Sequence, residues 1–361
     1  MWSVVLLFSR TKYPSVRCLG WLVHLLHCGC FIARRQLSER DGVIYLNFLK
    51  RFRVLTLTVF VITLCLVYLW QGADGSTQFI LMFRLPTLIG LIIAAAAIGV
   101  STLLFQTLSG NRILTPSLMG FDSLYVLLQT SMIFFFSTLD YVTLSVHWKF
   151  FGELALMTVL SVLLFSTLLV RLQSDFSRMI LTGIIFGVLF RSVSGFMTRV
   201  MSPNEYAVVQ ASSYARFSNI NEALLGYASV IVIVCLVLVY LISRKLDVMA
   251  LGRDMAIGLG VNYNMTAFQV LTIIAVMVAT ATALVGPVVF LGLLITSLVY
   301  RVSATQRHAS LLPLSVLLGV LVLVGGQVLL ERVLQMQVTL SIVIELCGGL
   351  VFLYLILRQK R

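Results

Sequence analysis

The chain has 361 residues, of which 60% are hydrophobic and only 11% are charged. Soluble domains carry about 25% charged residues, so this composition excludes a large soluble catalytic or nucleotide-binding domain. The net charge is +13, but the basic residues flank apolar runs, which indicates membrane orientation and no nucleic-acid partner. Since a membrane helix needs about 20 apolar residues, the sequence predicts an all-α, polytopic transmembrane bundle of about ten helices.

The N-terminal part of the chain differs in composition from everything that follows. It contains Cys28-Gly-Cys30 beside His24 and His27, a grouping that suggests a metal cluster. No second ligand pair stands at zinc-site spacing, so we expect no metal site. We predict that residues 1–49 are an N-terminal tail, interpreted either as a cytoplasmic segment or as an extension from a mis-assigned start. Residues 50–361 are predicted to form one membrane domain.

Apolar runs separated by short loops make up the rest of the chain. Pro86 stands in the first turn of the second run, where its missing N–H costs nothing. Gly286-Pro287 separates the seventh run from the eighth, and a polar stretch, 198–222, follows the fifth. The ten predicted spans are 54–70, 86–106, 117–137, 150–170, 178–196, 224–243, 265–285, 288–300, 311–330 and 338–357.

The distribution of basic residues predicts the orientation of these spans. Ten spans place both termini on one side, and from residue 50 onward the loops of that side carry fourteen Lys and Arg residues. The opposite loops carry five, namely Arg84, Lys149, Arg199, Arg216 and Arg332. Because cytoplasmic loops are enriched in Lys and Arg, both termini are predicted to be cytoplasmic.

Ionisable residues inside the spans are the first candidates for chemistry. Asp122, Glu153, Arg191 and Glu345 are each the lone ionisable group of their span. They do not cluster, which favours interhelical hydrogen bonding or snorkelling over a proton relay. Glu345 stands mid-span, and we expect it to face the bundle interior. An ion-coupled secondary transporter would need acidic residues near the midplane of broken helices, and only Glu345 meets that condition.

Catalysis on this chain is not indicated by any motif. The sequence contains no GxxxxGK[ST], no HExxH and no nucleophile elbow. A membrane-embedded enzyme would also need clustered polar groups, which are not seen. We therefore expect a protein that is not an enzyme and holds no cofactor.

The segment 247–261, DVMALGRDMAIGLGV, lies between the sixth and seventh spans on the predicted cytoplasmic side. It is amphipathic and interrupted by Gly252, Gly258 and Gly260. Two short helices with a sharp turn would present an apolar and charged knob, which a simple connector does not need. The segment predicts a soluble partner, and the alternative is an interfacial helix that lies on lipid.

Two arginines mark the sparsely charged outer side. Arg84 opens the second span and Arg332 follows the ninth. Each could pair with a carboxylate of a visiting protein. The alternative is that they anchor the helices to lipid phosphates.

Taken together, these residues resemble the permease subunits of bacterial ABC importers for iron–siderophore complexes and cobalamin, the FecCD/BtuC-type family. The resemblance runs from about residue 50 to the C-terminus and rests on four patterns in the family's order. The patterns are Arg84-Leu85-Pro86, the segment 104–120 with Gln106, Asn111 and Pro116, the segment 250–261 with Leu251-Gly252 and Leu259-Gly260-Val261, and Gly286-Pro287 with 288–293. The run 105–129 looks most like permeases of the catechol-siderophore subgroup, such as those for vibriobactin, enterobactin, anguibactin or petrobactin.

The resemblance implies a role for each candidate residue. The ATPase-coupling loop would contain Asp247, Ala250, Leu251, Gly252, Arg253, Ala256, Leu259 and Gly260. Arg84 and Arg332 match positions that dock a binding protein, and Arg191, Arg199 and Glu345 would belong to the gate or pathway. The chain departs from the family pattern at Thr87, at Arg112 and at Thr296-Ser297-Leu298.

The resemblance also implies the partners and the location. The chain would be a multi-pass permease of the bacterial inner (cytoplasmic) membrane. It would work with ABC ATPase subunits, a periplasmic substrate-binding protein and a second permease, identical or different, to import a ferric siderophore. The nearest alternative is another chelate, such as cobalamin or haem. Iron arrives already chelated, so no metal ligands are expected on the chain.

Overall fold

The computed structural model describes residues 39–70, 78, 80–143, 145–171, 176–215, 217, 220–303, 305–332 and 339–359. Within these ranges the chain is helical and contains no strand, which confirms the all-α prediction. The chain divides into two units, Met1–Thr56 and Leu57–Arg361, and helix α3 runs through the boundary. Most of the predicted tail, including Cys28 and Cys30, lies outside the described residues.

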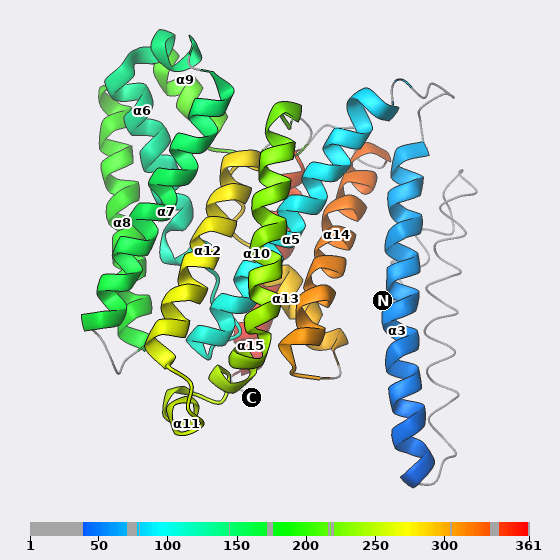
Figure 1. Cartoon of the computed structure of the whole chain (residues 1–361). Helices are drawn as coiled ribbons and strands as arrows, with labels where there is room; N and C mark the ends of the chain where they lie inside the picture. The colour runs from blue at the N-terminus through cyan, green and yellow to red at the C-terminus, as the bar shows by residue number, and fades with distance from the viewer. Residues whose placement is uncertain are drawn as a thin grey trace. The chain divides into compact units, whose positions relative to one another are not determined.

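Each of the ten predicted spans corresponds to one apolar helix. Six of these helices are long and apolar enough to cross a membrane, and four others have shorter apolar stretches, within the ranges given above. The elements in Figure 1 are α3 (Glu39–Trp70), η1 (Ile80–Arg84), α5 (Leu85–Ser109), η2 (Ser117–Met119), α6 (Phe121–Thr143), α7 (Val146–Arg171), α8 (Phe176–Val200), α9 (Pro203–Ser212), α10 (Glu222–Met249), α11 (Arg253–Gly258), α12 (Tyr263–Val285), α13 (Leu291–Val302), α14 (His308–Arg332) and α15 (Leu340–Gln359).

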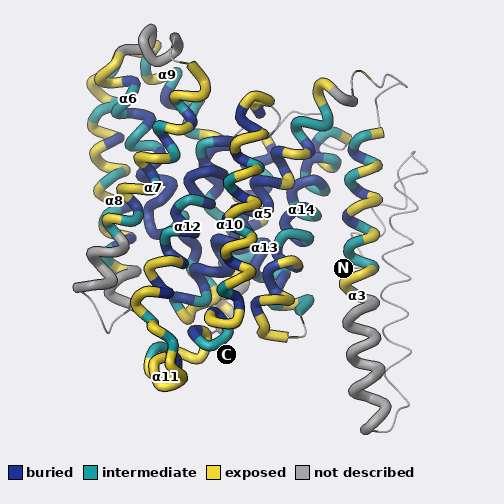
Figure 2. Tube along the Cα trace, viewed as in Figure 1, coloured by how far each residue is buried: buried dark blue, intermediate teal, exposed yellow. Residues whose placement is uncertain are grey.

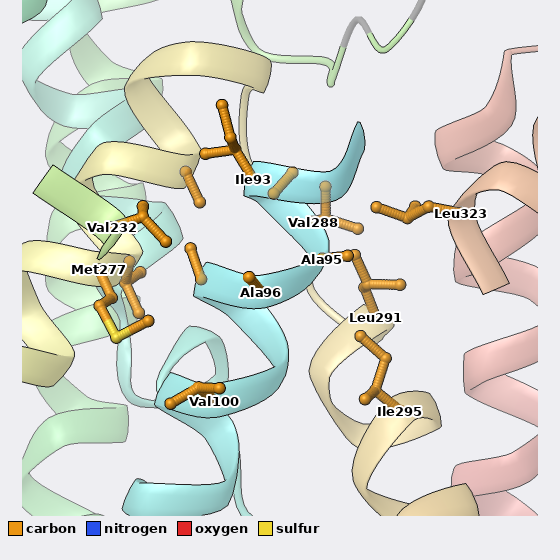
Figure 3. Close-up of a cluster of buried hydrophobic side chains, with 14 of the residues drawn as sticks. Ile93, Ala95, Ala96, Val100, Val232, Met277, Val288, Leu291, Ile295 and Leu323 are labelled. Carbon is orange, nitrogen blue, oxygen red and sulfur yellow. The ribbon is translucent and has the colours of Figure 1, made fainter. Parts of the chain in front are cut away.

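Helix α5 is the centre of the second unit. Its apolar window is 83% buried, more than in any of the other five long spans. Ala94–Ala97 present almost no side chain, so neighbouring helices approach the α5 backbone closely. A Cβ at Gly319 of α14 would come within 3.0 Å of the Ala95 carbonyl oxygen. Figure 3 shows this core, with Ile93, Ala95, Ala96 and Val100 of α5 between Val232 and Met277 on one side and Leu291, Ile295 and Leu323 on the other.

The outer helices of the same unit have the opposite pattern. The apolar windows of α8 and α10 are only 17% and 28% buried (Figure 2). Their exposed side chains are large and apolar, such as Leu181 and Ile185 of α8 and Leu241 of α10. In a bilayer such surfaces face lipid or another apolar chain, because exposed patches of this size are rare in soluble proteins.

An irregular segment, 110–120, connects α5 to α6. Gly120 has a φ of 95°, and a Cβ there would come within 2.7 Å of the Cα of Gly187, in the middle of α8. The segment bonds its own backbone: Met119 N–H donates to Pro116, and Gly120 N–H donates to Ser117. The segment therefore ends at the depth of the middle of α8, where α6 begins.

The polar stretch 198–222 contains the short helix α9. Ser202 accepts a hydrogen bond from the backbone of Glu205, whose carboxylate accepts one from the backbone of Ser202. This reciprocal capping box, with Pro203 in the first turn, explains why a helix begins there. The chain after α9 packs on the predicted break between the seventh and eighth spans, since a Cβ at Gly286 would lie 2.8 Å from the Cα of Ala215.

Candidate functional site

A single short helix, α11, projects between α10 and α12 at one end of the bundle (Figure 1). Gly252, with a φ of 100°, ends the extension of α10 and starts α11, and Gly260, with a φ of 83°, ends it. Both backbone conformations strain any residue with a Cβ, which explains the glycines of this segment. Asn262 then caps α12 by accepting a hydrogen bond from the backbone of Met265 at 3.3 Å.

The prediction of two short helices in 247–261 is wrong. Residues 247–249 continue α10 without interruption, and only α11 is a separate helix. Helix α10 continues past its last basic residues, Arg244 and Lys245, so its end takes the place of the first of the two predicted short helices. The projecting element is thus attached directly to the end of a membrane span.

The surface of α11 is apolar and exposed. Leu251, Met255, Ile257 and Leu259 are 62%, 66%, 53% and 62% exposed, whereas Ala256 is fully buried. Exposed apolar side chains of this size on a projecting turn are typical of a surface that another protein covers. Met255 and Ile257 were not among the individual residues that the sequence motifs selected, because their exposure depends on the helical register.

A side chain of the following helix, α12, contacts α11. The guanidinium carbon of Arg253 lies 5.9 Å from the ring centroid of Tyr263, a cation–π contact. Asp247, which the sequence assigned to the coupling loop, turns toward the bundle and contacts His308 of α14. Of the predicted loop residues, Ala250, Leu251, Gly252, Leu259 and Gly260 are exposed, Arg253 is half-buried and Ala256 is buried.

The two outer arginines have different environments. Arg84 is only 14% exposed, lies 3.5 Å from Glu331, stacks on the Tyr68 ring and donates to the Tyr68 carbonyl oxygen. Arg332 is exposed at the end of α14. The Arg84–Glu331 contact places the start of α5 beside the end of α14, as the predicted topology requires. Arg84 is thus held within the chain, whereas Arg332 is exposed.

The ionisable residues of the spans form hydrogen bonds between helices. Glu153 of α7 is buried and accepts from Gln129 Nε2 of α6 at 2.6 Å. Arg191 of α8 donates to Ser123 Oγ at 3.3 Å. These contacts confirm the expectation of interhelical hydrogen bonding for both residues. The Oδ2 atom of Asp122 is buried without a hydrogen-bond partner among the described residues.

The expectation for Glu345 is wrong. Its side chain is exposed on α15 of this single chain and does not face the bundle interior. The neighbouring residues Leu346 and Leu350 are also exposed, at 65% and 60%, so the whole face of α15 is uncovered. Arg191 and Arg199 are likewise exposed on α8. Among the described residues, no group of three or more His, Cys, Asp or Glu side chains is placed to hold a metal ion.

Comparison with known proteins places this arrangement in a family. Residues 50–358 match the FecCD transport family. The chain is 38% identical over 287 residues to the petrobactin import system permease protein YclO of Bacillus subtilis, covering 80% of this chain and 91% of that protein. It is 33% identical to the petrobactin import system permease protein FatC of Bacillus anthracis, covering 77% and 78%.

The fold is also found in a solved structure. A metal-chelate type ABC transporter in an inward-facing conformation superposes with a TM-score of 0.71 at 22% identity, covering 85% of this chain and 99% of that chain. Together with the family match and the permease relatives, the apolar helices packed around α5 define a membrane permease. The chain belongs to the FecCD transport family.

Proposed function

We propose that this chain is the permease subunit of an ABC importer that moves a ferric siderophore of the catecholate type into the cytoplasm. The proposal is supported by the two petrobactin permeases, which share 38% and 33% identity with this chain. ATP would be hydrolysed on a separate subunit. A second permease chain, identical or different, would complete the membrane part, and a substrate-binding protein would deliver the chelate at the outer side.

The observation that carries the coupling to an ATPase is the exposed apolar surface of α11. Leu251, Met255 and Ile257 would enter a groove on the ATPase subunit, which fits helix-in-groove recognition by apolar anchors. Because α10 runs unbroken into this segment, a displacement of α11 acts directly on a membrane span. The two states of the permease would then be selected by the nucleotide state of the ATPase.

The uncovered faces of α8 and α15 suit the interface with the second permease and the route of the substrate. Arg191, Arg199 and Glu345 are the polar groups that the sequence assigns to this gate or pathway. All three are exposed on the single chain. A ferric catecholate is anionic, so the two arginines would favour its passage and Glu345 would oppose it unless protonated.

The docking of the binding protein would rest chiefly on Arg332. Its exposed guanidinium can form a charge-assisted pair with a carboxylate. Arg84 would contribute only after exchanging its contact with Glu331 for one with the partner. The structural asymmetry between the two arginines therefore separates their roles.

Uptake of radioactive iron tests this function. A strain that lacks the gene is given ferric catecholates, ferric hydroxamates, haem and, with its own label, cobalamin. We expect loss of catecholate uptake alone, restored by the wild-type gene and by Met255→Leu but not by Met255→Glu, with equal amounts of each protein in the membrane. Selective loss of haem, hydroxamate or cobalamin uptake would reject the catecholate assignment, and uptake restored by Met255→Glu would reject coupling through α11.

A further inference from the structure

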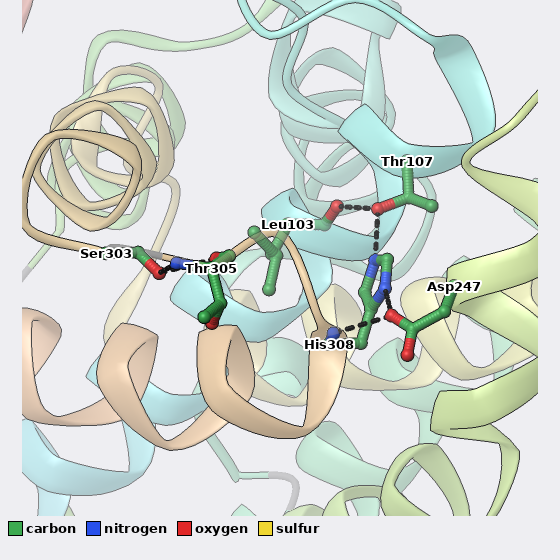
Figure 4. Close-up of polar contacts among 6 residues, drawn as sticks. All are labelled: Leu103, Thr107, Asp247, Ser303, Thr305 and His308. Carbon is green, nitrogen blue, oxygen red and sulfur yellow. Dashed lines mark hydrogen bonds and ion pairs between the residues drawn. The ribbon is translucent and has the colours of Figure 1, made fainter. Parts of the chain in front are cut away.

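A series of hydrogen bonds joins the end of α10 to α14 and α5 (Figure 4). Asp247 of α10 accepts from the backbone N–H of His308 and contacts the ring Nδ1 of the same residue, both through Oδ1 at 2.7 Å. The other ring nitrogen, Nε2, lies 2.7 Å from Thr107 Oγ1 of α5. The His308 side chain is 3% exposed and Asp247 is 33% exposed. The hydrogen bonds therefore run from the partly exposed Asp247 through the buried His308 to the half-buried Thr107.

Donors and acceptors are matched at Asp247 Oδ1, at both ring nitrogens of His308 and at Thr107 Oγ1. An ionised carboxylate only accepts, so Nδ1 carries a proton and donates to Asp247. A hydroxyl has one proton, so Thr107 donates either to His308 Nε2 or to the Leu103 carbonyl oxygen, which lies 3.0 Å away. If Thr107 donates to Leu103, a protonated Nε2 donates to the hydroxyl, and the link between His308 and Thr107 is kept. The buried His308 ring is paired at both nitrogens, which makes the network rigid, because each lost bond leaves a buried ring nitrogen unpaired.

Asp247 also caps α14 from outside that helix. His308 is the first residue of α14, and its backbone N–H has no partner within the helix. The carboxylate meets this N–H at the positive end of the helix dipole, an arrangement that stabilises a negative charge. The end of α10 and the start of α14 are thus joined by two hydrogen bonds to one oxygen atom.

The residue next to Thr107 extends the connection to a fourth helix. Gln106 Nε2 donates to Thr296 Oγ1 of α13 at 3.0 Å and to the Arg112 carbonyl oxygen at 2.7 Å. The inner end of α5 is therefore bonded to α13 through Gln106 and to α14 and α10 through Thr107. Asp247 is separated from the start of α11 by only five residues.

We propose that the Asp247–His308–Thr107 chain is a positioning link that carries the displacement of α11 from the end of α10 to α14 and to the central helix α5. This inference rests on the proposed function, because it assumes that an ATPase moves α11. Without the link, α10 could shift alone. With it, α10, α14 and α5 move together, so that ATP hydrolysis changes the packing around α5.

Thr107→Val tests the link, because it removes the hydroxyl and keeps the shape of the side chain. Thr107→Ser restores a hydroxyl. Thr272→Val of α12 is the matched control, since Thr272 makes the same bond to the carbonyl four residues earlier, at 2.9 Å, but lies outside the link. The complex of permease, ATPase and binding protein is assembled in lipid vesicles. Two ratios are measured. The first is the rate of ATP hydrolysis in the presence of binding protein divided by the rate in its absence. The second is the number of ferric catecholate molecules transported per ATP hydrolysed.

We expect Thr107→Val to lower both ratios by about fivefold or more, the lower end of coupling between distant sites. Thr107→Ser and Thr272→Val are expected to stay within about twofold of the wild type, less than such a coupling. The double variant, Thr107→Val with Asp247→Ala, is expected to lower the two ratios no more than Asp247→Ala alone, because both changes break the same series of hydrogen bonds.

Three results would overturn the link. The first is that both ratios are unchanged in Thr107→Val. The second is that the fold-loss of the ratios in the double variant equals the product of the two single fold-losses. The third is that Thr107→Val fails to copurify with the ATPase while Thr272→Val copurifies. The last would make Thr107 a residue of stability only. A wrong substrate assignment is recognised separately, because the wild type would then show stimulated ATP hydrolysis without transport of the ferric catecholate.

Discussion

Gly187→Ala in α8 tests the close approach of α8 to the segment before α6. A Cβ at Gly187 would lie 3.0 Å from the Cα of Gly120, and a Cβ at Gly120 would lie 2.7 Å from the Cα of Gly187. Non-bonded carbons pack best at about 3.5–4.0 Å, so the two backbones would have to separate by roughly 0.5–1 Å. Both contacts are with backbone atoms, and no side-chain rotation can relieve them.

The expected cost follows from two terms of opposite sign. Overpacking of this size costs about 1–3 kcal/mol, whereas alanine in place of glycine inside a helix gains roughly 0.8–1.0 kcal/mol. Gly195→Ala on the same helix is the matched control, since a Cβ there meets nothing within 4 Å. The helix-propensity gain is common to both variants and cancels. Their stabilities should therefore differ by the overpacking term alone, about 1–3 kcal/mol.

Thermal unfolding of the purified protein in detergent measures this difference. Each kcal/mol shifts the Tm of a large domain by roughly 2–4 °C, so Gly187→Ala should unfold several degrees below Gly195→Ala. Gly195→Ala should unfold at or above the wild-type temperature. A Gly187→Ala protein as stable as Gly195→Ala would show that α8 does not pack on Gly120, and the depth assigned to 110–120 would be wrong.

Four further variants, at Glu153, Arg332 and Arg84, probe polar residues. Glu153→Leu removes the oxygen that accepts a hydrogen bond from Gln129 at 2.6 Å, and should lower the free energy of unfolding by about 1–3 kcal/mol. Glu153→Gln keeps an acceptor oxygen and should lower it clearly less. Equal unfolding temperatures of the two variants would contradict the buried contact. Arg332→Glu should weaken binding-protein affinity about tenfold, the effect of roughly 1.4 kcal/mol, without lowering the Tm. Arg84→Gln should lower the Tm because it loses Glu331 and Tyr68; an unchanged Tm would show that Arg84 is not held within the chain.

Hydropathy and length predicted one apolar helix for each span, because a bilayer restricts membrane helices to a narrow range of lengths. The break at Gly286-Pro287 was predicted, since neither residue favours the helix interior. Helix α9 has no hydropathy signal, because its capping box lies in a polar stretch without an apolar face. Only the family resemblance implied a helix after the fifth span. The failed expectation for Glu345 has a different cause. Position along a span gives depth in the bilayer, whereas the facing direction depends on which neighbours pack against α15.

The candidate site could be predicted only in part. The glycines and apolar residues of α11 are close in sequence, so the segment was recognisable. His308 and Thr107 carry no local signal, since His308 stands 61 positions from Asp247 and 201 from Thr107. No motif relates residues at such separations, and only the packing of α10, α14 and α5 brings them together. The pairing of Arg84 with Glu331, 247 positions apart, was hidden for the same reason.

The packing of 110–120 also bears on how the chain is inserted during synthesis. Thr115, Pro116, Met119 and Gly120 are buried. Irregular backbone at bilayer depth is tolerated only where protein covers it. Part of that cover is Gly183 and Gly187 of α8, more than 60 residues later in translation. We therefore expect the stretch 110–120 to gain this part of its cover only after α7 and half of α8 have been synthesised.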